Sequence, residues 1–431
     1  MAGIGKSKKQ AGFLLLMLMG LGLACLALPE SAECGAAPAW IKRYHVSDIW
    51  GFHSAMALDG QGNVYVTGGA KGSQTGFDYL TIKYSPGGKQ LWAQRYNGPV
   101  NGDDASTGLA VDSKGNVYVT GWSRGGRNRW DLATVKYRAD GRRLWVRRYL
   151  SGGEAKGIAM DAEDNIYVTG ERVTIKYDPD GRQIWVRPFD APNSHPVALA
   201  VDGQGNAYLH GSLTNPGSSL PTLKYSPDGL LLWMTGCQFH GDLPSEFWYN
   251  TIALDTQGNA YVSGGTVFGR GFLTIKYSPE GQQLWERWED LEGNYSPPSA
   301  VAVDGQGNVY VAGTVASYGD PRSHYSNYIT IKYSPDGQTL WIQEGFSDSY
   351  ASALTLDGQG NVYITGSSTI KYNPEGQILW EQMSNFGAWP RAIALDAQGS
   401  VYVTGLSWDY ASYTAQDFVT VKYIQTPRTG R

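Results

Sequence analysis

The 431-residue sequence has only three cysteines and six histidines, and neither charge sign is in marked excess. With 35 basic and 39 acidic side chains, the net charge is −4, and no basic field exists to attract nucleic acid. The histidines lack metal-ligand spacing, and no nucleophile motif is recognisable. We therefore expect no catalytic residues, no metal and no cofactor, and the composition by itself identifies no partner.

Long hydrophobic runs are also missing, apart from one near the start of the chain. Residues 1–28 place Lys6, Lys8 and Lys9 before a short apolar run that is followed by small residues, as in an export signal. The run is short for a lasting membrane helix. We assign residues 1–36 to a signal peptide and short leader, and expect an extracellular, cell-surface or periplasmic protein.

The end of this segment leaves two forms of processing open. The stretch "GLAC" at 22–25 resembles a bacterial lipoprotein box, although Gly22 stands where leucine is usual. Lipidation of Cys25 would be the protein's only attachment to a membrane. Ordinary cleavage within 27–37 is the other possibility, slightly favoured by that departure.

The chain also lacks any long stretch of helical hydrophobic period, while it is rich in Gly (56), Tyr (28) and Trp (15). One phrase recurs instead, as "LDGQGNVYVTG" at 58–68 and "VDGQGNVYVAG" at 303–313. Its acidic residue returns at intervals of 39 to 53 residues, which is the spacing of propeller blades. The eight copies are Asp59, Asp112, Asp161, Asp202, Asp255, Asp304, Asp357 and Asp396.

Each copy carries a second regular phrase, such as "TIKYSPGGKQLW" at 81–92. The first phrase predicts two strands joined by an Asp/Gly/Asn turn, and the second predicts two more joined by a Pro/Gly turn. One unit is thus a four-stranded antiparallel blade. We expect the recurring tyrosines and tryptophans, such as Tyr84 and Trp92, to pack between adjacent blades.

The last unit lacks its fourth strand, because the chain ends soon after "DFVTVKY" at 417–423. A matching strand, "AWIKRY" at 39–44, precedes the first unit. We therefore predict an all-β, eight-bladed propeller over residues 37–425, closed by the N-terminal strand completing the last blade, with a tail at 426–431. Cys34 and Cys237 then lie on opposite sides of the ring, so we expect no structural disulfide. We expect a monomer.

The phrase D-x-x-G-N-x-Y-V-x-G resembles the bacterial SBBP-type β-propeller repeat and covers nearly all of the mature chain. That resemblance implies an exported or surface protein without an assigned reaction. The family name implies seven blades, whereas this sequence gives eight. The segment Gly337 to Trp341 is similar to the tryptophan-docking segment of eight-bladed quinoprotein-type propellers. The vicinal cysteine pair of quinoprotein dehydrogenases has no counterpart here.

A lysine also recurs in every unit, and the parallel course of first and third strands brings it towards the acidic residue of the turn. We predict buried Asp–Lys latches, represented by Asp59 with Lys83, Asp112 with Lys136 and Asp304 with Lys332. The alternative is that the recurring lysines form a ring that binds an anion.

Function is expected on the face that carries the connections of variable length. These connections contain aromatic and polar residues suited to sugars, peptides or another protein. The candidates are Trp50, His53, Trp122, Trp130, Trp248, Tyr325, Trp389, Trp408 and Tyr410. The leading hypothesis is a non-catalytic exported module that binds a polysaccharide or a surface protein. An envelope lipoprotein scaffold is the second hypothesis, and a propeller enzyme of unknown reaction is the third.

Overall fold

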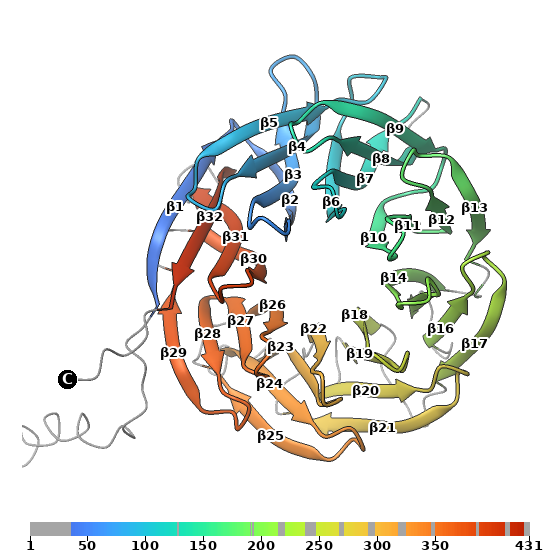
Figure 1. Cartoon of the computed structure of the whole chain (residues 1–431), viewed down its shortest axis with the longest axis vertical. Coiled ribbons are helices and arrows are strands. Elements are labelled where there is room, and N and C mark those ends of the chain that lie inside the picture. Colours follow the sequence, from blue (N-terminus) through green and yellow to red (C-terminus); the bar gives the residue numbers. More distant parts are fainter. Residues whose placement is uncertain are drawn as a thin grey trace, which may run out of the picture.

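A computed structural model describes residues 36–126, 129–189, 191, 194–213, 220–237, 247–266, 271–291, 298–317, 325–345, 350–384, 388–409 and 414–425. Within these residues the secondary structure is entirely β, with 32 strands in eight four-stranded sheets. No helix among them is long and apolar enough to cross a membrane. The eight sheets stand around a central axis as the blades of a propeller (Figure 1).

Each of the first four blades is an antiparallel meander of four consecutive strands, called a to d from the axis outward. Blades 1 and 2 comprise β2 (Ile49–Leu58), β3 (Val64–Lys71), β4 (Phe77–Tyr84), β5 (Gln90–Tyr96), β6 (Asp104–Val111), β7 (Val117–Arg124), β8 (Trp130–Tyr137) and β9 (Arg143–Tyr149). Blades 3 and 4 comprise β10 (Ala155–Met160), β11 (Ile166–Gly170), β12 (Val173–Tyr177), β13 (Gln183–Pro188), β14 (Ser194–Val201), β15 (Ala207–Leu213), β16 (Leu220–Tyr225) and β17 (Leu231–Cys237).

The next three blades repeat this order, and the eighth departs from it. Blades 5 and 6 comprise β18 (Phe247–Leu254), β19 (Ala260–Thr266), β20 (Gly271–Tyr277), β21 (Gln283–Asp290), β22 (Pro298–Val303), β23 (Val309–Ser317), β24 (Tyr325–Tyr333) and β25 (Thr339–Glu344). Blade 7 comprises β26 (Ala351–Leu356), β27 (Val362–Gly366), β28 (Ser368–Tyr372) and β29 (Ile378–Met383). Blade 8 comprises β30 (Ala388–Leu395), β31 (Val401–Asp409), β32 (Thr414–Ile424) and, as its outer strand, β1 (Ala37–His45).

Closure of the ring is confirmed by the pairing of β1 with β32. The two strands are antiparallel, with Trp40 opposite Lys422 and Tyr44 opposite Phe418. Figure 1 shows the N-terminal strand, in blue, along the outer side of the red C-terminal strand. The Trp40 indole N–H donates to the Pro86 carbonyl of blade 1 at 3.0 Å, so the added strand also joins the last blade to the first. The predicted eight-bladed architecture is correct.

The a–b turns show why the repeated phrase is conserved from blade to blade. In blade 1 the Asp59 carboxylate accepts hydrogen bonds from the main-chain N–H groups of Gln61 (3.0 Å) and Asn63 (2.9 Å). Gly62 has φ +76°, a left-handed conformation that costs glycine little. The acidic residue therefore caps its own turn, and Gly62 lets the chain reverse direction into strand b.

The core consists of separate apolar layers between neighbouring blades rather than one central core. Strand b supplies fully buried residues such as Val64 and Tyr65, and strand d supplies a tryptophan. Trp92 of blade 1 packs between Tyr65 of its own blade (5.9 Å between ring centroids) and Tyr137 of blade 2 (6.1 Å). Adjacent blades are thus held together by alternating tyrosine and tryptophan rings, as the sequence predicts.

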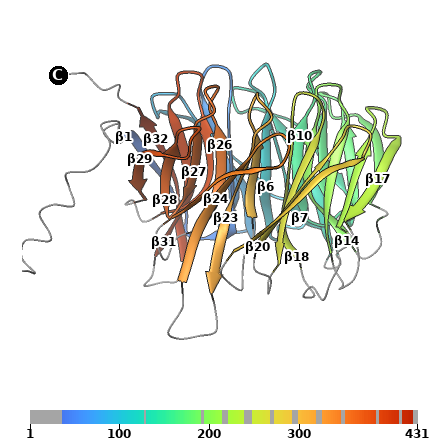
Figure 2. The same ribbon diagram turned by 90° about the horizontal axis from the view of Figure 1, so that it is seen from below.

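The meander gives the disc two different faces. The a–b and c–d turns lie on one face, called the turn face, along the upper side of Figure 2. The b–c and d–a connections lie on the opposite face, called the loop face. The shortest b–c connections belong to blade 3, where β12 starts at Val173, and blade 7, where β28 starts at Ser368. These two blades stand opposite each other in the ring (Figure 1).

Candidate functional site

The structure describes the side chains of only part of the aromatic set expected on the loop face. Trp122, Trp130 and Trp389 are described completely. Five others belong to described strands, although their side chains lie outside the described part: Trp50, His53, Trp248, Tyr325 and Trp408. Tyr410 lies entirely outside the described residues.

Trp122 and Trp130 form an aromatic pair at the loop-face end of blade 2. Their strands β7 and β8 are paired, and the two indoles meet edge to face with ring centroids 4.5 Å apart. Trp122 is only 6% exposed, whereas Trp130 is 40% exposed. The guanidinium of Arg124 lies 5.6 Å from the centre of the Trp130 ring. Trp122 therefore supports an indole that remains partly accessible and has a cation over its ring.

A network of charged residues lies next to this pair. The fully buried Asp104 accepts hydrogen bonds from the Ser123 hydroxyl (2.5 Å) and from the main-chain N–H of Gly98 (2.6 Å). Arg148 donates to Ser123 at 2.5 Å and to Asp131 at 2.8 Å. Burial raises the pKa of Asp104 above its usual value, although these hydrogen bonds oppose the shift. The carboxylates here are occupied by structural partners.

Asp103 and Asp104 are adjacent in the chain but do not form a pair of catalytic carboxylates. Asp104 is directed into the buried network, whereas an Asp103 oxygen accepts from the main-chain N–H of Phe77 at 3.1 Å. The other Asp103 oxygen lies 3.9 Å from Arg124. The arrangement positions Arg124 near Trp130 and thereby supports the aromatic pair.

Trp389 occupies another part of the loop face, on β30 of blade 8. It is partly buried and meets Tyr350 edge to face, with ring centroids 6.2 Å apart. Figure 1 shows β30 and the β7–β8 hairpin on different sides of the central axis. The structure therefore brings together Trp122 and Trp130 but does not join Trp389 to them.

The acidic and basic residues expected to form latches meet at the turn face. Asp59 lies 3.6 Å from Lys83, and Asp112 lies 3.6 Å from Lys136, with all four side chains at most 7% exposed. Three further pairs lie within ion-pair distance: Asp161–Lys176 at 3.2 Å, Asp202–Lys224 at 3.9 Å and Asp396–Lys422 at 3.4 Å. For Asp304 and Lys332 no ion pair appears among the described residues, and Lys332 instead donates to the Pro374 carbonyl at 2.8 Å.

Sequence reasoning missed a second partner of these lysines. Lys276 of blade 5 donates to the main-chain carbonyl of Pro335, which belongs to the c–d turn of blade 6 (3.2 Å). The indole N–H of Trp285 donates to the same oxygen at 2.9 Å. This arrangement recurs at the acceptors Ala139, Pro179, Pro227, Pro279 and Pro374. The recurrence of proline in the c–d turn phrase is the sequence signal that could have revealed it.

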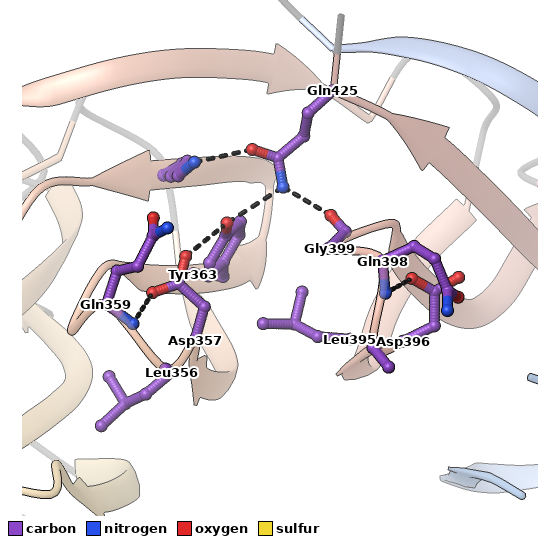
Figure 3. Close-up of a pocket in the computed structure, with 12 residues that line it drawn as sticks. Leu356, Asp357, Gln359, Tyr363, Leu395, Asp396, Gln398, Gly399 and Gln425 are labelled. Atoms are coloured by element: carbon purple, nitrogen blue, oxygen red, sulfur yellow. Dashed lines mark hydrogen bonds between the residues drawn. The ribbon is translucent and has the colours of Figure 1, made fainter. Parts of the chain in front are cut away.

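At the junction between blades 7 and 8, called the seam, Gln425 stands in the position of this proline, and among the described residues neither Lys371 nor Trp380 donates to a main-chain carbonyl there. Lys371 donates instead to the side-chain oxygen of Gln425 at 2.6 Å. The Gln425 amide nitrogen bridges the Tyr363 hydroxyl (2.9 Å) and the Gly399 carbonyl (2.6 Å) (Figure 3). The indole nitrogen of Trp380 is buried and has no hydrogen-bond partner among the residues that the structure describes.

A hollow of about 620 Å³ opens at this seam on the turn face, and it is called the seam hollow. Its walls are the a–b turns of blades 7 and 8, together with Tyr363, Lys371 and Gln425 (Figure 3). Asp357 and Asp396 line it, but both carboxylates already cap their own turns. Among the described residues, no group of three His, Cys, Asp or Glu side chains could hold a metal ion.

Comparisons with known proteins agree with the repeat architecture. Curated relatives include an uncharacterized WD repeat-containing protein L264 of Acanthamoeba polyphaga mimivirus, which is 31% identical over 108 residues. That match covers 21% of this chain and only 8% of the relative's length.

Similar solved structures include a streptogramin B lyase, which shows 13% identity and a TM-score of 0.47 and covers 89% of this chain and 97% of that one. A protein of unknown function from Bacteroides caccae shows 15% identity and a TM-score of 0.39, covering 62% of this chain and 93% of that one. Residues 91–126 match the family model described as SBBP, a beta-propeller repeat. The repeated phrase is therefore confirmed as an SBBP-type β-propeller repeat.

Proposed function

We propose that the protein is an exported, non-catalytic binding module that recognises a glycan through its loop face, with Trp130 as the main contact. The observation that carries the proposal is the 40% exposed Trp130 indole, which meets Trp122 edge to face and has the Arg124 guanidinium over its ring. A rigid, partly exposed indole offers apolar area together with an N–H donor, and little conformational entropy is lost when a ligand binds to it.

The charged residues beside Trp122 and Trp130 already have hydrogen-bond partners, which favours binding over catalysis. Asp104, Asp131 and Arg148 are held by one another or by Ser123 and main-chain groups, so none of them is poised to exchange a proton with a substrate. A general acid or base must reach the reacting group and titrate near the working pH. A surface protein is the other class of partner that an accessible indole suits, and the experiment below separates the two.

The lengths of the connections favour an extended ligand. Blades 3 and 7 have the shortest b–c connections and stand opposite each other, so the loop face is expected to be low at both ends of one diameter. A polysaccharide chain can lie across such a trough, whereas a small enclosed ligand gains little from it.

A glycan array probed with the protein lacking residues 1–35 tests the proposal. We expect Trp130→Ala to weaken binding of the selected glycan about tenfold or more, the range expected for losing an aromatic contact. Trp288→Ala is the matched control, because Trp288 is also 40% exposed but lies on the outer strand β21. Equal losses in both variants, or none in either, would contradict the proposal. Capture of a surface protein without any glycan would favour the protein partner.

The proposed export of the protein is tested separately. Mass spectrometry of the mature N-terminus, on protein recovered from the envelope and from the medium, distinguishes the two forms of processing. Cleavage within 27–37 supports simple export, and a diacylglyceryl group on Cys25 supports the lipoprotein scaffold. A chain that retains residues 1–28 in the cytoplasm would overturn export altogether.

A further inference from the structure

The outer rim of the ring is formed by strand d of each blade. One side of each strand d pairs with strand c, and the other side has no neighbouring strand among the described residues. Open strand edges pair readily with another chain, and native proteins protect them with charged side chains or proline. The residues of each strand d therefore show how well that edge is protected.

Charged side chains are present on every outer strand except that of blade 4. Each of the other outer strands contains at least one Lys, Arg, Asp or Glu. Strand β17 reads Leu-Leu-Trp-Met-Thr-Gly-Cys and contains none. Leu230, just before β17, stands where blade 2 has Arg142. Thr235 likewise stands where blade 2 has Arg147.

The same stretch exposes apolar side chains. Leu230 is 64% exposed, Leu231 and Leu232 are each 51% exposed, and Met234 is 52% exposed. Three of these four residues belong to β17, whereas no other outer strand has more than two exposed large hydrophobic side chains among the described residues. Blade 4 therefore combines an exposed apolar edge with the absence of protecting charges.

The charges of the outer strands indicate which partner the edge of β17 fits. In a symmetric pair of copies an outer strand meets itself, so any net charge on it faces the same charge on the other copy. Strand β9 has three arginines and no acidic residue, and β21 has three acidic residues against one arginine. Self-pairing of those strands brings like charges together. Strand β17 has no charge, so a second copy of this chain meets no repulsion there.

The shape of the ring leaves room for such a contact. Strand β17 lies on the outer side of blade 4, and the rim curves away from it towards blades 3 and 5 (Figure 1). Two copies can thus approach through one blade each. Antiparallel pairing over the full length of Leu231–Cys237 places Met234 opposite Met234 of the second copy and Leu232 opposite Gly236, which has no side chain to obstruct it.

We propose that two copies of the protein associate through β17, which joins their blade 4 sheets into one continuous sheet, instead of remaining the monomer expected from the sequence. Because the pairing is antiparallel, the second copy is inverted and the two loop faces point in opposite directions. One strand edge is smaller than the standard protein interface of about 1,600 Å², so we expect a micromolar dissociation constant. The contact is independent of the glycan contact proposed for the loop face.

Sedimentation velocity at roughly 1–100 µM tests the association, on the full chain and on a chain that starts at Ala36. We expect both to dimerise. Met234→Lys should weaken the dimer about tenfold or more, because two lysines then face each other. Ile342→Lys is the matched control, since Ile342 occupies the same position on β25 and is 38% exposed, and it should leave the association unchanged. The melting temperature of each variant checks its folding.

A charge-swap experiment tests self-pairing directly. Met234→Glu alone should also dimerise weakly, whereas a mixture of Met234→Lys and Met234→Glu should associate about tenfold more tightly than either variant alone, because opposite charges then meet. Failure of the mixture to associate contradicts pairing of β17 with itself. Equal weakening by Met234→Lys and Ile342→Lys contradicts it as well.

Hydrogen exchange gives a measurement on the parent protein that does not depend on any variant. The main-chain amides of β17 should exchange more slowly at high protein concentration than at low concentration, and those of β25 should not change. A monomer at about 100 µM, or exchange in β17 that is independent of concentration, overturns the proposal. Dimerisation of the full chain alone assigns the contact to residues 1–35 and also overturns it.

Discussion

The junction between blades 5 and 6 and the seam between blades 7 and 8 use the same rings but different polar partners. Trp285 packs between two tyrosines at 6.0 Å, and Trp380 packs between two tyrosines at 6.2 and 6.4 Å. The Trp285 indole donates to Pro335, whereas the Trp380 indole has no hydrogen-bond partner within the described part of the chain. The ring packing is therefore alike at the two junctions, whereas the polar partner of the indole differs.

We expect the largest effect from removing β1, the strand that completes blade 8 at the seam. Deleting residues 36–45 takes away β1 and leaves the edge of β32 unpaired, together with the Trp40 contact to blade 1. We expect loss of cooperative unfolding or aggregation, because an open ring exposes an apolar edge strand. Circular dichroism melting, with a chain that starts at Ala36 as control, measures this. Identical melting curves would mean that closure contributes nothing to stability.

The next test concerns the substitute acceptor at the seam. Gln425→Ala removes three hydrogen bonds of 2.6 to 2.9 Å and leaves the buried Lys371 without its acceptor. We expect a loss of about 2–3 kcal/mol in the free energy of unfolding, since the bond to a charged donor dominates. Gln398→Ala is the control, because Gln398 lines the same hollow but is exposed. A Gln425→Ala loss no larger than that of the control would show that the glutamine is incidental.

Paired substitutions of the two tryptophans sharpen the comparison further. Trp285→Phe and Trp380→Phe remove similar ring area, but only the first breaks a hydrogen bond and leaves the Pro335 carbonyl without its indole donor. We expect Trp285→Phe to cost about 1–3 kcal/mol more than Trp380→Phe. Urea unfolding of both variants measures the difference. Equal losses would show that the shared carbonyl adds nothing beyond packing.

The smallest expected effect is a pH dependence of stability caused by His210, a residue of blade 4. His210 stands in β15 where most other blades have threonine, and it contacts the Thr222 hydroxyl at 2.9 Å. Burial lowers the pKa of His210 from 6.5 to about 3, so on acidification the unfolded chain takes up its proton before the folded one does. Stability is therefore lost as pH falls below about 6.5, by about 1 kcal/mol at pH 5.5.

Unfolding titrations at pH 7.5 and 5.5 test this dependence, with His210→Thr as the matched variant that copies the other blades. The variant should lose less stability between the two pH values than the parent protein does. If both lose the same amount, His210 is not the group responsible.

The sequence predicts the ring, its blade number and its closure because those features depend on local phrases. The turn phrase marks strands a and b, the second phrase marks strands c and d, and the chain end that lacks a tryptophan strand identifies "AWIKRY" as its complement. The approach of Asp59 to Lys83 also follows from the parallel course of strands a and c. Each of these inferences uses residue types at fixed spacing.

The candidate sites depend on relations that spacing does not contain. Trp122 and Trp130 look equivalent in the sequence, and only the packing of β7 against β8 buries the first and exposes the second. The shared carbonyls are main-chain atoms of the neighbouring blade, so the recurring proline marks their position in the turn but not the donors that they receive. At the seam hollow, Ile424 and Gln425 replace the Ser-Pro of most other blades, and this replacement is the signal that the sequence offers.

The pairing of β1 with β32 also sets a schedule for folding during synthesis. The strand β1 leaves the ribosome well before its partner β32, because Thr414 follows His45 by 369 residues. At roughly 5–20 residues per second, β1 waits on the order of 20–75 s for that partner. Throughout this interval every nascent chain carries an unpaired strand that fits the β32 edge of any finished but unclosed copy nearby. Slower translation or delayed export would therefore favour exchange of first strands between chains.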